Sequence, residues 1–381
     1  MTGGLASPPR AGIAAFLLGS AGMFATMYST QAILPELSNA FDVSPSTAGL
    51  SVSVVVLAVA VGAWVWGPVS DRIGRTRAIR LASWLLVIPT LGVALAPDFG
   101  LLLGFRALQG LCMPGLLIVG APYVVESFVP AVGQRAMGWY VSSLVVGGLI
   151  GRVGVALASA VVGWRWAIGL LALLPLAAAV GMHGTLPPAP LPVRSGRALR
   201  SVLARPLIAV ALTGGALFFT FVGTFTYVVY RFEAPPFSYG TSVASLVFLL
   251  WLIGAALGPF VGRFAELLGW RRLAALSTVL AAAGLMIALP DWTPTIVLGL
   301  AGLAAGMFTA YTATQLGVSD VARADRGAAS AFYFSAYYGA GALGAYLPGL
   351  AWEAWGWTGV ASLGLASLAL AGAALTATRR R

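Results

Sequence analysis

Twelve stretches of roughly twenty mostly apolar residues dominate this chain of 381 residues. Each is long enough to cross the hydrocarbon core of a bilayer as a helix, because a helix rises about 1.5 Å per residue. Hydrophobic residues make up 59% of the sequence and charged residues only 9%, so lipid must cover most of the surface. The sequence therefore predicts an all-α, multi-pass protein of the cell (inner or plasma) membrane. We expect the helices near residues 11–34, 46–69, 78–96, 100–122, 134–160, 164–184, 206–231, 241–262, 272–289, 294–315, 327–350 and 356–376.

The positive charges of the chain follow a topological pattern. All 22 basic residues are arginines, and most of them cluster in alternate loops between the apolar stretches. The opposite loops carry the acids Glu36, Asp42, Asp98, Glu233, Asp291 and Glu353, with only Arg165 and Arg231 nearby. Since cytoplasmic loops are rich in arginine, both termini are expected in the cytoplasm. The net charge of +11 therefore needs no nucleic-acid partner to explain it.

A Pro- and Arg-rich strip at residues 185–205 falls close to the middle of the chain. It is typical of a cytoplasmic linker, here between an N-terminal six-helix bundle (1–184) and a C-terminal one (206–381). The two halves share spaced residues, which favours a duplication with pseudo-two-fold symmetry. Tyr140, Gly148, Gly151, Gly163 and Trp164 recur as Tyr333, Gly341, Gly344, Gly356 and Trp357, and Gly67, Asp71 and Gly74 recur as Gly262, Glu266 and Gly269.

The loop after the second apolar stretch carries the most specific motif. Its sequence from Gly67 to Arg77, GPVSDRIGRTR, resembles the hallmark loop Gly-x-x-x-Asp-Arg-x-Gly-Arg-Arg of the major facilitator superfamily. We expect Gly74 to turn the chain and Asp71 to cap a helix or pair with arginine. The alternative is a solvated basic loop that only sets topology. The resemblance implies gating roles for Gly67, Asp71, Arg72, Gly74, Arg75 and Arg77, with Glu126 expected to pair with this basic loop.

Two intramembrane arginines lie in further segments that resemble the same superfamily. Arg106 begins a segment, RALQG, which resembles a motif that the family links to proton coupling, with Gln109 beside it. The alternative is that Arg106 snorkels to the lipid headgroups. Arg152 follows GGLIG and occupies the proline position of a motif that marks proton-coupled antiporters, while Val155 replaces a glycine. Arg152 is expected to bind an anionic group, neutralise a carboxylate or close an outer gate.

The proton path is less defined, because no acid lies in the middle of a span. Glu36 is expected either to exchange with Arg106 or Arg152 at an outer gate or to anchor the chain at the interface. Segments 163–166, 323–327 and 230–237 also resemble the superfamily, the last its drug or sugar efflux branch. In that fold, the first, fourth, seventh and tenth helices line the central cavity, and the eleventh adds two tyrosines. The resulting cavity candidates are Met27, Tyr28, Gln31, Met113, Phe221, Phe225, Tyr227, Met307, Tyr311, Gln315, Tyr333 and Tyr337.

What the sequence lacks excludes other classes. Without lysine there is no phosphate-binding loop, and His183 is the only histidine, so a metal pair or a Ser-His-Asp triad is not expected. The sequence therefore does not predict an enzyme. No cofactor is expected, and a proton gradient is the expected source of energy. We expect a monomeric secondary transporter that works by alternating access and couples protons to the efflux of small amphiphilic compounds. A facilitator or symporter for sugars or organic anions, and a non-transporting receptor or scaffold, remain alternatives.

Overall fold

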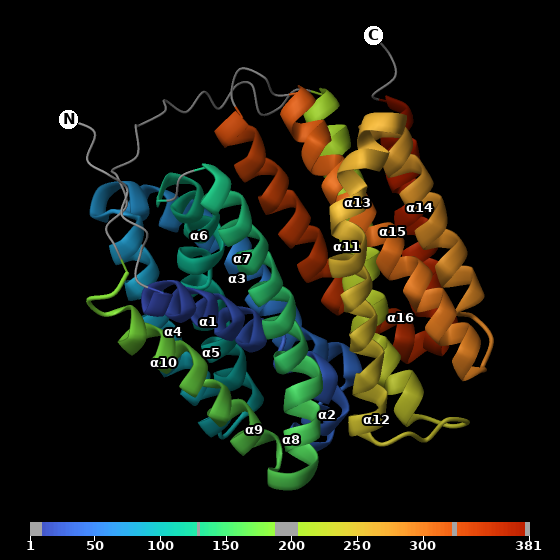
Figure 1. Cartoon of the computed structure of the whole chain (residues 1–381). Helices are drawn as coiled ribbons and strands as arrows, with labels where there is room; N and C mark the ends of the chain where they lie inside the picture. Colours follow the sequence, from blue (N-terminus) through green and yellow to red (C-terminus); the bar gives the residue numbers. More distant parts are fainter. Residues whose placement is uncertain (1–9, 128–129, 187–204, 322–325, 378–381) are drawn as a thin grey trace. The chain divides into compact units, whose positions relative to one another are not determined.

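The computed structural model describes residues 10–127, 130–186, 205–321 and 326–377, and every regular element in these ranges is helical (Figure 1). The linker 185–205 and the segment 323–327 therefore lie largely outside the described residues. The helices are α1 (Arg10–Met27), η1 (Gln31–Ile33), α2 (Leu34–Phe41), α3 (Pro45–Ile73), α4 (Arg75–Leu95), α5 (Phe99–Cys112), α6 (Pro114–Ser127), α7 (Pro130–Leu149), η2 (Ile150–Gly154), α8 (Val155–Val162), α9 (Trp164–Leu171), α10 (Leu173–Met182), α11 (Arg205–Glu233), α12 (Thr241–Ser245), η4 (Leu246–Trp251), α13 (Leu252–Leu268), α14 (Trp270–Ile287), α15 (Thr293–Val321) and α16 (Arg326–Ala377).

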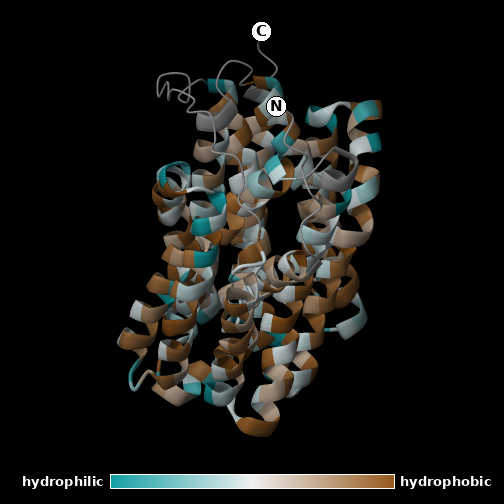
Figure 2. Ribbon diagram, turned by 60° about the vertical axis from the view of Figure 1, so that its left-hand side comes forward, coloured by the Kyte–Doolittle hydropathy of each residue, from teal (hydrophilic) through white to brown (hydrophobic). Residues whose placement is uncertain are grey.

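Eleven continuous helical segments in the described residues are long and apolar enough to cross a membrane. The last of them, Ala329–Thr376, changes direction at Gly356, whose backbone angles (φ 58°, ψ −145°) are not helical. Counting its two arms separately gives twelve spans, at the positions expected from the sequence. Leu95 (77% exposed) and Val161 (84% exposed) are examples of large apolar side chains that face outward. Figure 2 shows apolar residues along most of the helices, as a lipid-facing surface requires.

The described residues form two compact units. The first unit comprises Met1–Ile33 and Val61–Ser195, and the second comprises Leu34–Ala60 and Gly196–Arg381. In the first unit, α1 packs against α7 and α10, while α4 packs against α5, α6 and α9. In the second, α11 lies along α16 and α15, and α14 packs along α15. The predicted division at residues 185–205 stays a prediction.

Two pairs of glycines at equivalent places in the halves share a positive φ angle. Gly74 (φ 89°) and Gly269 (φ 75°) separate α3 from α4 and α13 from α14. Gly163 (φ 80°) and Gly356 (φ 58°) mark the corresponding turns nearer the other ends of the helices. A positive φ is readily adopted only by glycine, so these residues are required by the turns that they make. The shared geometry supports the duplication inferred from the sequence spacing.

The two arginines that departed from the charge pattern of the loops have a structural role. Arg165 donates from Nη1 to the carbonyl oxygens of Ala94 (3.1 Å) and Ala96 (2.7 Å), at the end of α4. Arg231 donates to the carbonyl of Ala288 (2.6 Å), just past the end of α14. The last carbonyls of a helix lack intrahelical partners and carry partial negative charge. Both arginines therefore donate hydrogen bonds to backbone carbonyl groups at the C-terminal end of a helix.

Candidate functional site

The first span is interrupted between α1 and α2. α1 ends at Met27, a short 3-10 turn covers Gln31–Ile33, and α2 begins at Leu34 next to Pro35. Proline has no N–H to donate, clashes with the carbonyl four residues earlier and disfavours helical geometry in the residue before it. The sequence predicted a single helix over 11–34, so the interruption and the extension to Phe41 are additions from the structure. The interruption leaves helix-terminal carbonyls inside the first unit.

Arg106 satisfies those carbonyls. Its guanidinium donates to the carbonyl oxygens of Thr26 (2.8 Å) and Met27 (2.6 Å), and to Oε1 of Gln109 (2.8 Å). Gln109 in turn donates from Nε2 to Thr90 Oγ1 (3.2 Å). Arg106 is 0% exposed, so the snorkelling alternative is wrong: the side chain turns inward to the end of α1. This places a positive charge at a helix C-terminus, where the helix dipole stabilises it.

Arg152 forms a second buried cluster at the same interruption. It sits in the π-helical turn η2 and is 0% exposed. Its Nε donates to Gln31 Oε1 (2.7 Å), its Nη1 donates to the Gly148 carbonyl (2.9 Å), and its Cζ lies 3.7 Å from the centre of the Tyr28 ring. These contacts come from neutral groups. A guanidinium held by an amide and an aromatic face can still attract an anion, and π-helical turns occur often at functional sites.

Glycines on α7 and η2 bring these clusters together. An added Cβ at Gly147 would collide with the backbone of Ala21, and one at Gly151 with the backbone of Ala25. These two glycines therefore allow a close contact between the helices. It holds the helix that carries Arg152 against α1, next to the residues of the interruption. Packing through small residues is the usual way in which membrane helices approach closely.

Met113 lies where the fourth span changes course. It is fully buried between α5, which ends at Cys112, and α6, which begins at Pro114. Its backbone N–H donates to the carbonyl of Gln109 (3.2 Å), next to the Arg106 cluster. The predicted cavity candidates Met27, Tyr28, Gln31 and Met113 are thus all buried in the first unit near the two arginines.

The basic loop predicted to act in gating forms an ion-pair cluster. Arg75 donates from Nε to Glu126 Oε2 (2.9 Å) and from Nη2 to Glu126 Oε1 (3.0 Å), a two-pronged contact. Its Nη1 also lies 3.6 Å from Asp71 Oδ1 and donates to Ser70 Oγ (3.1 Å). The predicted pairing of Glu126 with this loop is confirmed, and so is the turn at Gly74. The gating role of the cluster stays a prediction.

The other residues of this loop are less enclosed. Arg72 and Arg77 are exposed, and Gly67 is half-buried in α3, where its carbonyl accepts from Ser70 Oγ (2.9 Å). Exposed arginines beside a membrane span interact with headgroups and water, which is their role in setting topology. Within the described residues, no cluster of three or more His, Cys, Asp or Glu side chains is arranged to hold a metal ion.

In the second unit, aromatic rings from three spans pack together. The ring centres of Phe221 and Phe225 on α11 lie 4.7 Å apart, and Trp251 is 4.7 Å from Phe221. Phe308 on α15 lies 5.6 Å from Phe221, and Phe248 lies 6.0 Å from Phe225. The sequence predicted Phe221 and Phe225 as cavity residues but missed the other three rings. The spacing of these residues along their own helices does not predict the contact, because the contact depends on which helices become neighbours.

A tyrosine-rich cluster forms a second group in this unit. The hydroxyls of Tyr333 and Thr314 lie 2.7 Å apart, and Gln315 Nε2 donates to the hydroxyl of Tyr311 (3.3 Å). Tyr337 stacks on Phe218 at 4.0 Å and lies 5.4 Å from Tyr311. Met307, the remaining candidate of α15, is buried (2% exposed). The predicted residues Tyr311, Gln315, Tyr333 and Tyr337 therefore lie together.

Tyr227 and Glu36 are the remaining candidates. Tyr227 donates from its hydroxyl to the Ala345 carbonyl (2.8 Å), and added Cβ atoms at Gly49 and Gly349 would collide with it. The structure therefore gives Tyr227 a packing contact. Glu36 is half-buried on α2, in the second unit, whereas both buried arginines belong to the first. Its predicted exchange with Arg106 or Arg152 stays a prediction.

The comparisons with known proteins agree on one family. The model of the Major Facilitator Superfamily matches residues 16–345. The MFS-type transporter YybF of Bacillus subtilis (strain 168) is 28% identical over 327 residues, which are 84% of this chain and 81% of that protein. The inner membrane transport protein YnfM of Escherichia coli (strain K12) is 30% identical over 262 residues, 64% of this chain and 61% of that protein.

A solved structure shares the fold. The crystal structure of a D-xylose-proton symporter superposes with a TM-score of 0.75 and 17% sequence identity, covering 96% of this chain and 97% of that one. At this level of identity the likeness concerns the fold alone.

Proposed function

The chain belongs to the major facilitator superfamily and is a multi-pass membrane transporter, and on that premise we propose that it exports small amphiphilic compounds in exchange for protons. The proposal includes alternating access, function as a monomer and cytoplasmic termini. The observation that carries it is the pair of fully buried guanidinium groups at the interruption of the first span. Ionisable residues inside a membrane are expensive and serve transport in most proteins that retain them.

The two arginines have different roles in the proposed transport. Arg106 is bound to the end of α1 and to Gln109, so it fixes the local backbone at the interruption. Arg152 is held by the side chains of Gln31 and Tyr28, which can rotate away when a ligand arrives. If an anionic group of the substrate replaced these neutral side chains beside the guanidinium, the ionic attraction would offset the free-energy cost of removing the guanidinium from water. We therefore propose that Arg152 makes transport selective for the charge of the substrate.

The Arg75–Glu126–Asp71 cluster supports the conformational part of the proposal. Charge-assisted, two-pronged contacts are among the stronger hydrogen bonds in proteins, and they depend on geometry. A cluster of this kind stabilises one conformation and is lost when its elements separate. Coupling to protons rests on the resemblance of the segment that begins at Arg106, together with the altered antiporter motif at Arg152.

The second unit offers surfaces suited to the apolar part of a substrate. The Phe221–Trp251–Phe308 group and the Tyr311–Tyr337 group combine aromatic faces with a few hydroxyls. Binding sites for small molecules are commonly lined in this way, with few polar groups to fix orientation. These side chains support a broad preference for amphiphilic compounds.

The second candidate function is a facilitator or symporter of organic anions. It is favoured by one observation, the contacts of the Arg152 guanidinium with the Gln31 amide and the Gly148 carbonyl, which an anionic ligand could replace. The two candidates differ in whether protons move against the solute, with it or not at all.

The experiment that tests the proposal uses purified protein in liposomes that contain a pH-sensitive dye. Anionic, neutral and cationic amphiphiles of matched size are presented in turn, and solute uptake is measured in parallel. Proton movement opposite to the solute and restricted to one charge class is the expected result. Solute uptake without any proton movement would contradict proton exchange and favour the facilitator. No uptake of any class, by protein that remains folded, would contradict the substrate class.

A further inference from the structure

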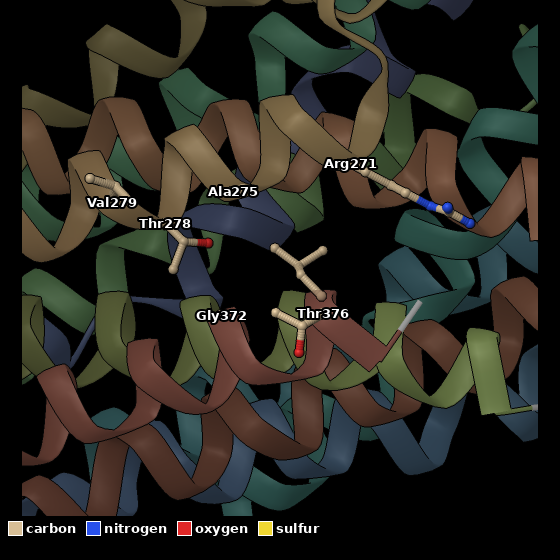
Figure 3. Close-up of a pocket in the computed structure, with 7 residues that line it drawn as sticks. Arg271, Ala275, Thr278, Val279, Gly372 and Thr376 are labelled. Atoms are coloured by element: carbon tan, nitrogen blue, oxygen red, sulfur yellow. The ribbon is translucent and has the colours of Figure 1, made fainter. Parts of the chain in front are cut away.

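A groove runs between α14 and the C-terminal arm of α16, inside the second unit. Figure 3 shows its lining side chains: those of α14 form one wall and those of α16 the other. Most of the lining is apolar, and the hydroxyls of Thr278 and Thr376 are used by carbonyls of their own helices, Ala274 and Ala373. The lining residues are Arg271, Ala275, Thr278, Val279, Gly372, Leu375 and Thr376.

The dimensions of the groove suit a chain better than a compact ligand. Its volume is about 180 Å³, whereas sites for drug-sized ligands span about 300–1,000 Å³. From Arg271 to Val279 the wall follows eight residues of helix, which is roughly 12 Å at 1.5 Å per residue. Val279 is 66% exposed, so the groove opens on the apolar perimeter. A narrow, apolar, open groove on a membrane protein fits a lipid acyl chain.

One end of the groove is strongly basic. Arg271 lies there, with its guanidinium extending beyond the groove and its Cζ 5.2 Å from the centre of the Trp270 ring (Figure 3). Arg272 follows it, exposed, in the first turn of α14, whose N-terminal Gly269 supplies no side-chain cap. Tryptophan and arginine at a helix end mark the headgroup level, and free N–H groups at a helix start attract anions.

We propose that this groove binds an anionic phospholipid, with one acyl chain along α14 and α16 and the phosphate at Arg271 and Arg272. The acyl chain gains van der Waals packing against the groove walls, and lipids with identical acyl chains gain it equally. Selectivity therefore comes from the headgroup charge. Basic pockets between membrane helices bind anionic headgroups, and each arginine near such a charge changes affinity about fivefold.

The test measures lipid binding to the full chain, purified in detergent, by native mass spectrometry. Phosphatidylglycerol and phosphatidylcholine with identical acyl chains are titrated separately. We expect phosphatidylglycerol to bind about 25-fold more tightly, from two arginines at about fivefold each. Arg271→Gln should lower this ratio about fivefold. Arg263→Gln is the matched control, because Arg263 is an exposed arginine of α13 that does not line the groove.

A second variant tests the acyl chain. Gly372 lines the groove and nothing lies within 4 Å of a Cβ added there, so the Cβ of Gly372→Leu is accommodated and the rest of the side chain occupies groove space. It should weaken both lipids and leave their ratio unchanged, and the unfolding temperature confirms that each variant is folded. Equal ratios in wild type and Arg271→Gln, or unchanged affinity in Gly372→Leu, would overturn the proposal. A lipid-binding signal without headgroup preference would also overturn it.

Discussion

The contact between α1 and α7 gives a prediction whose size follows from the structure. A Cβ placed on Gly147 would lie 2.6 Å from both the Cα and the carbonyl carbon of Ala21. Carbon atoms pack best at about 3.5–4.0 Å, so Gly147→Ala must push the two helices apart by roughly 1 Å. The atoms in the way are backbone and cannot rotate aside. Overpacking of this kind typically costs about 1–3 kcal/mol.

A second glycine of the same helix provides the control. Gly138 is exposed, and nothing lies within 4 Å of a Cβ added there. Gly138→Ala should therefore stabilise α7 by about 0.5–1 kcal/mol, the usual gain in helix propensity. Because this gain applies equally at Gly147, the two alanine variants should differ by the overpacking cost alone, about 1–3 kcal/mol, although the chemical change is identical.

The assay is unfolding of the purified protein in mixed micelles as the denaturing detergent is increased, followed by tryptophan fluorescence. The shift in unfolding free energy is compared for both variants against wild type. Gly147→Ala should also slow transport, because the contact holds the Arg152 helix against α1. If Gly147→Ala proved as stable as Gly138→Ala, the close approach of α1 and α7 would be refuted.

Three further predictions concern buried charge, backbone conformation and the ion-pair cluster. Arg152→Met combined with Gln31→Leu should stabilise the protein by about 1–4 kcal/mol in the same unfolding assay, because a buried charge and its amide partner become apolar; a loss of stability would contradict this. Gly356→Ala should cost about 1–3 kcal/mol, since φ 58° with ψ −145° is accessible almost only to glycine, and unchanged stability would exclude the strain. Glu126→Gln should cost about 1 kcal/mol, a small value because the pair with Arg75 is partly exposed, and should reduce transport rate more than stability. A transport rate of Glu126→Gln equal to that of wild type would contradict a gating role for Glu126.

Much of the fold was predictable because hydrophobic length decides it. The twelve spans follow from runs of apolar residues, and the turn at Gly74 follows from the glycine of the loop motif. The pairing of Glu126 with the basic loop was also predictable, since opposite charges at the same membrane face attract. These features depend on local composition or on depth in the membrane.

Other features depend on which helices become neighbours, and the sequence did not predict them. Trp251 and Phe308 join Phe221 from different spans, and no spacing within one helix indicates their meeting. The inward turn of Arg106 needs the interruption after Met27, which supplies carbonyl acceptors inside the first unit. Sequence alone suggested that this side chain could reach the headgroups instead. Proline at position 35 was the available signal for the interruption.

Arg152 is proposed to make transport selective for the charge of the substrate. The most direct test measures uptake into liposomes of a carboxylate amphiphile and its neutral methyl ester, by wild type and by Arg152→Gln. We expect wild type to distinguish the two compounds and the variant to transport both at similar rates, close to that of the ester. An unchanged preference in Arg152→Gln, or an equal loss of both compounds by a folded variant, would contradict it.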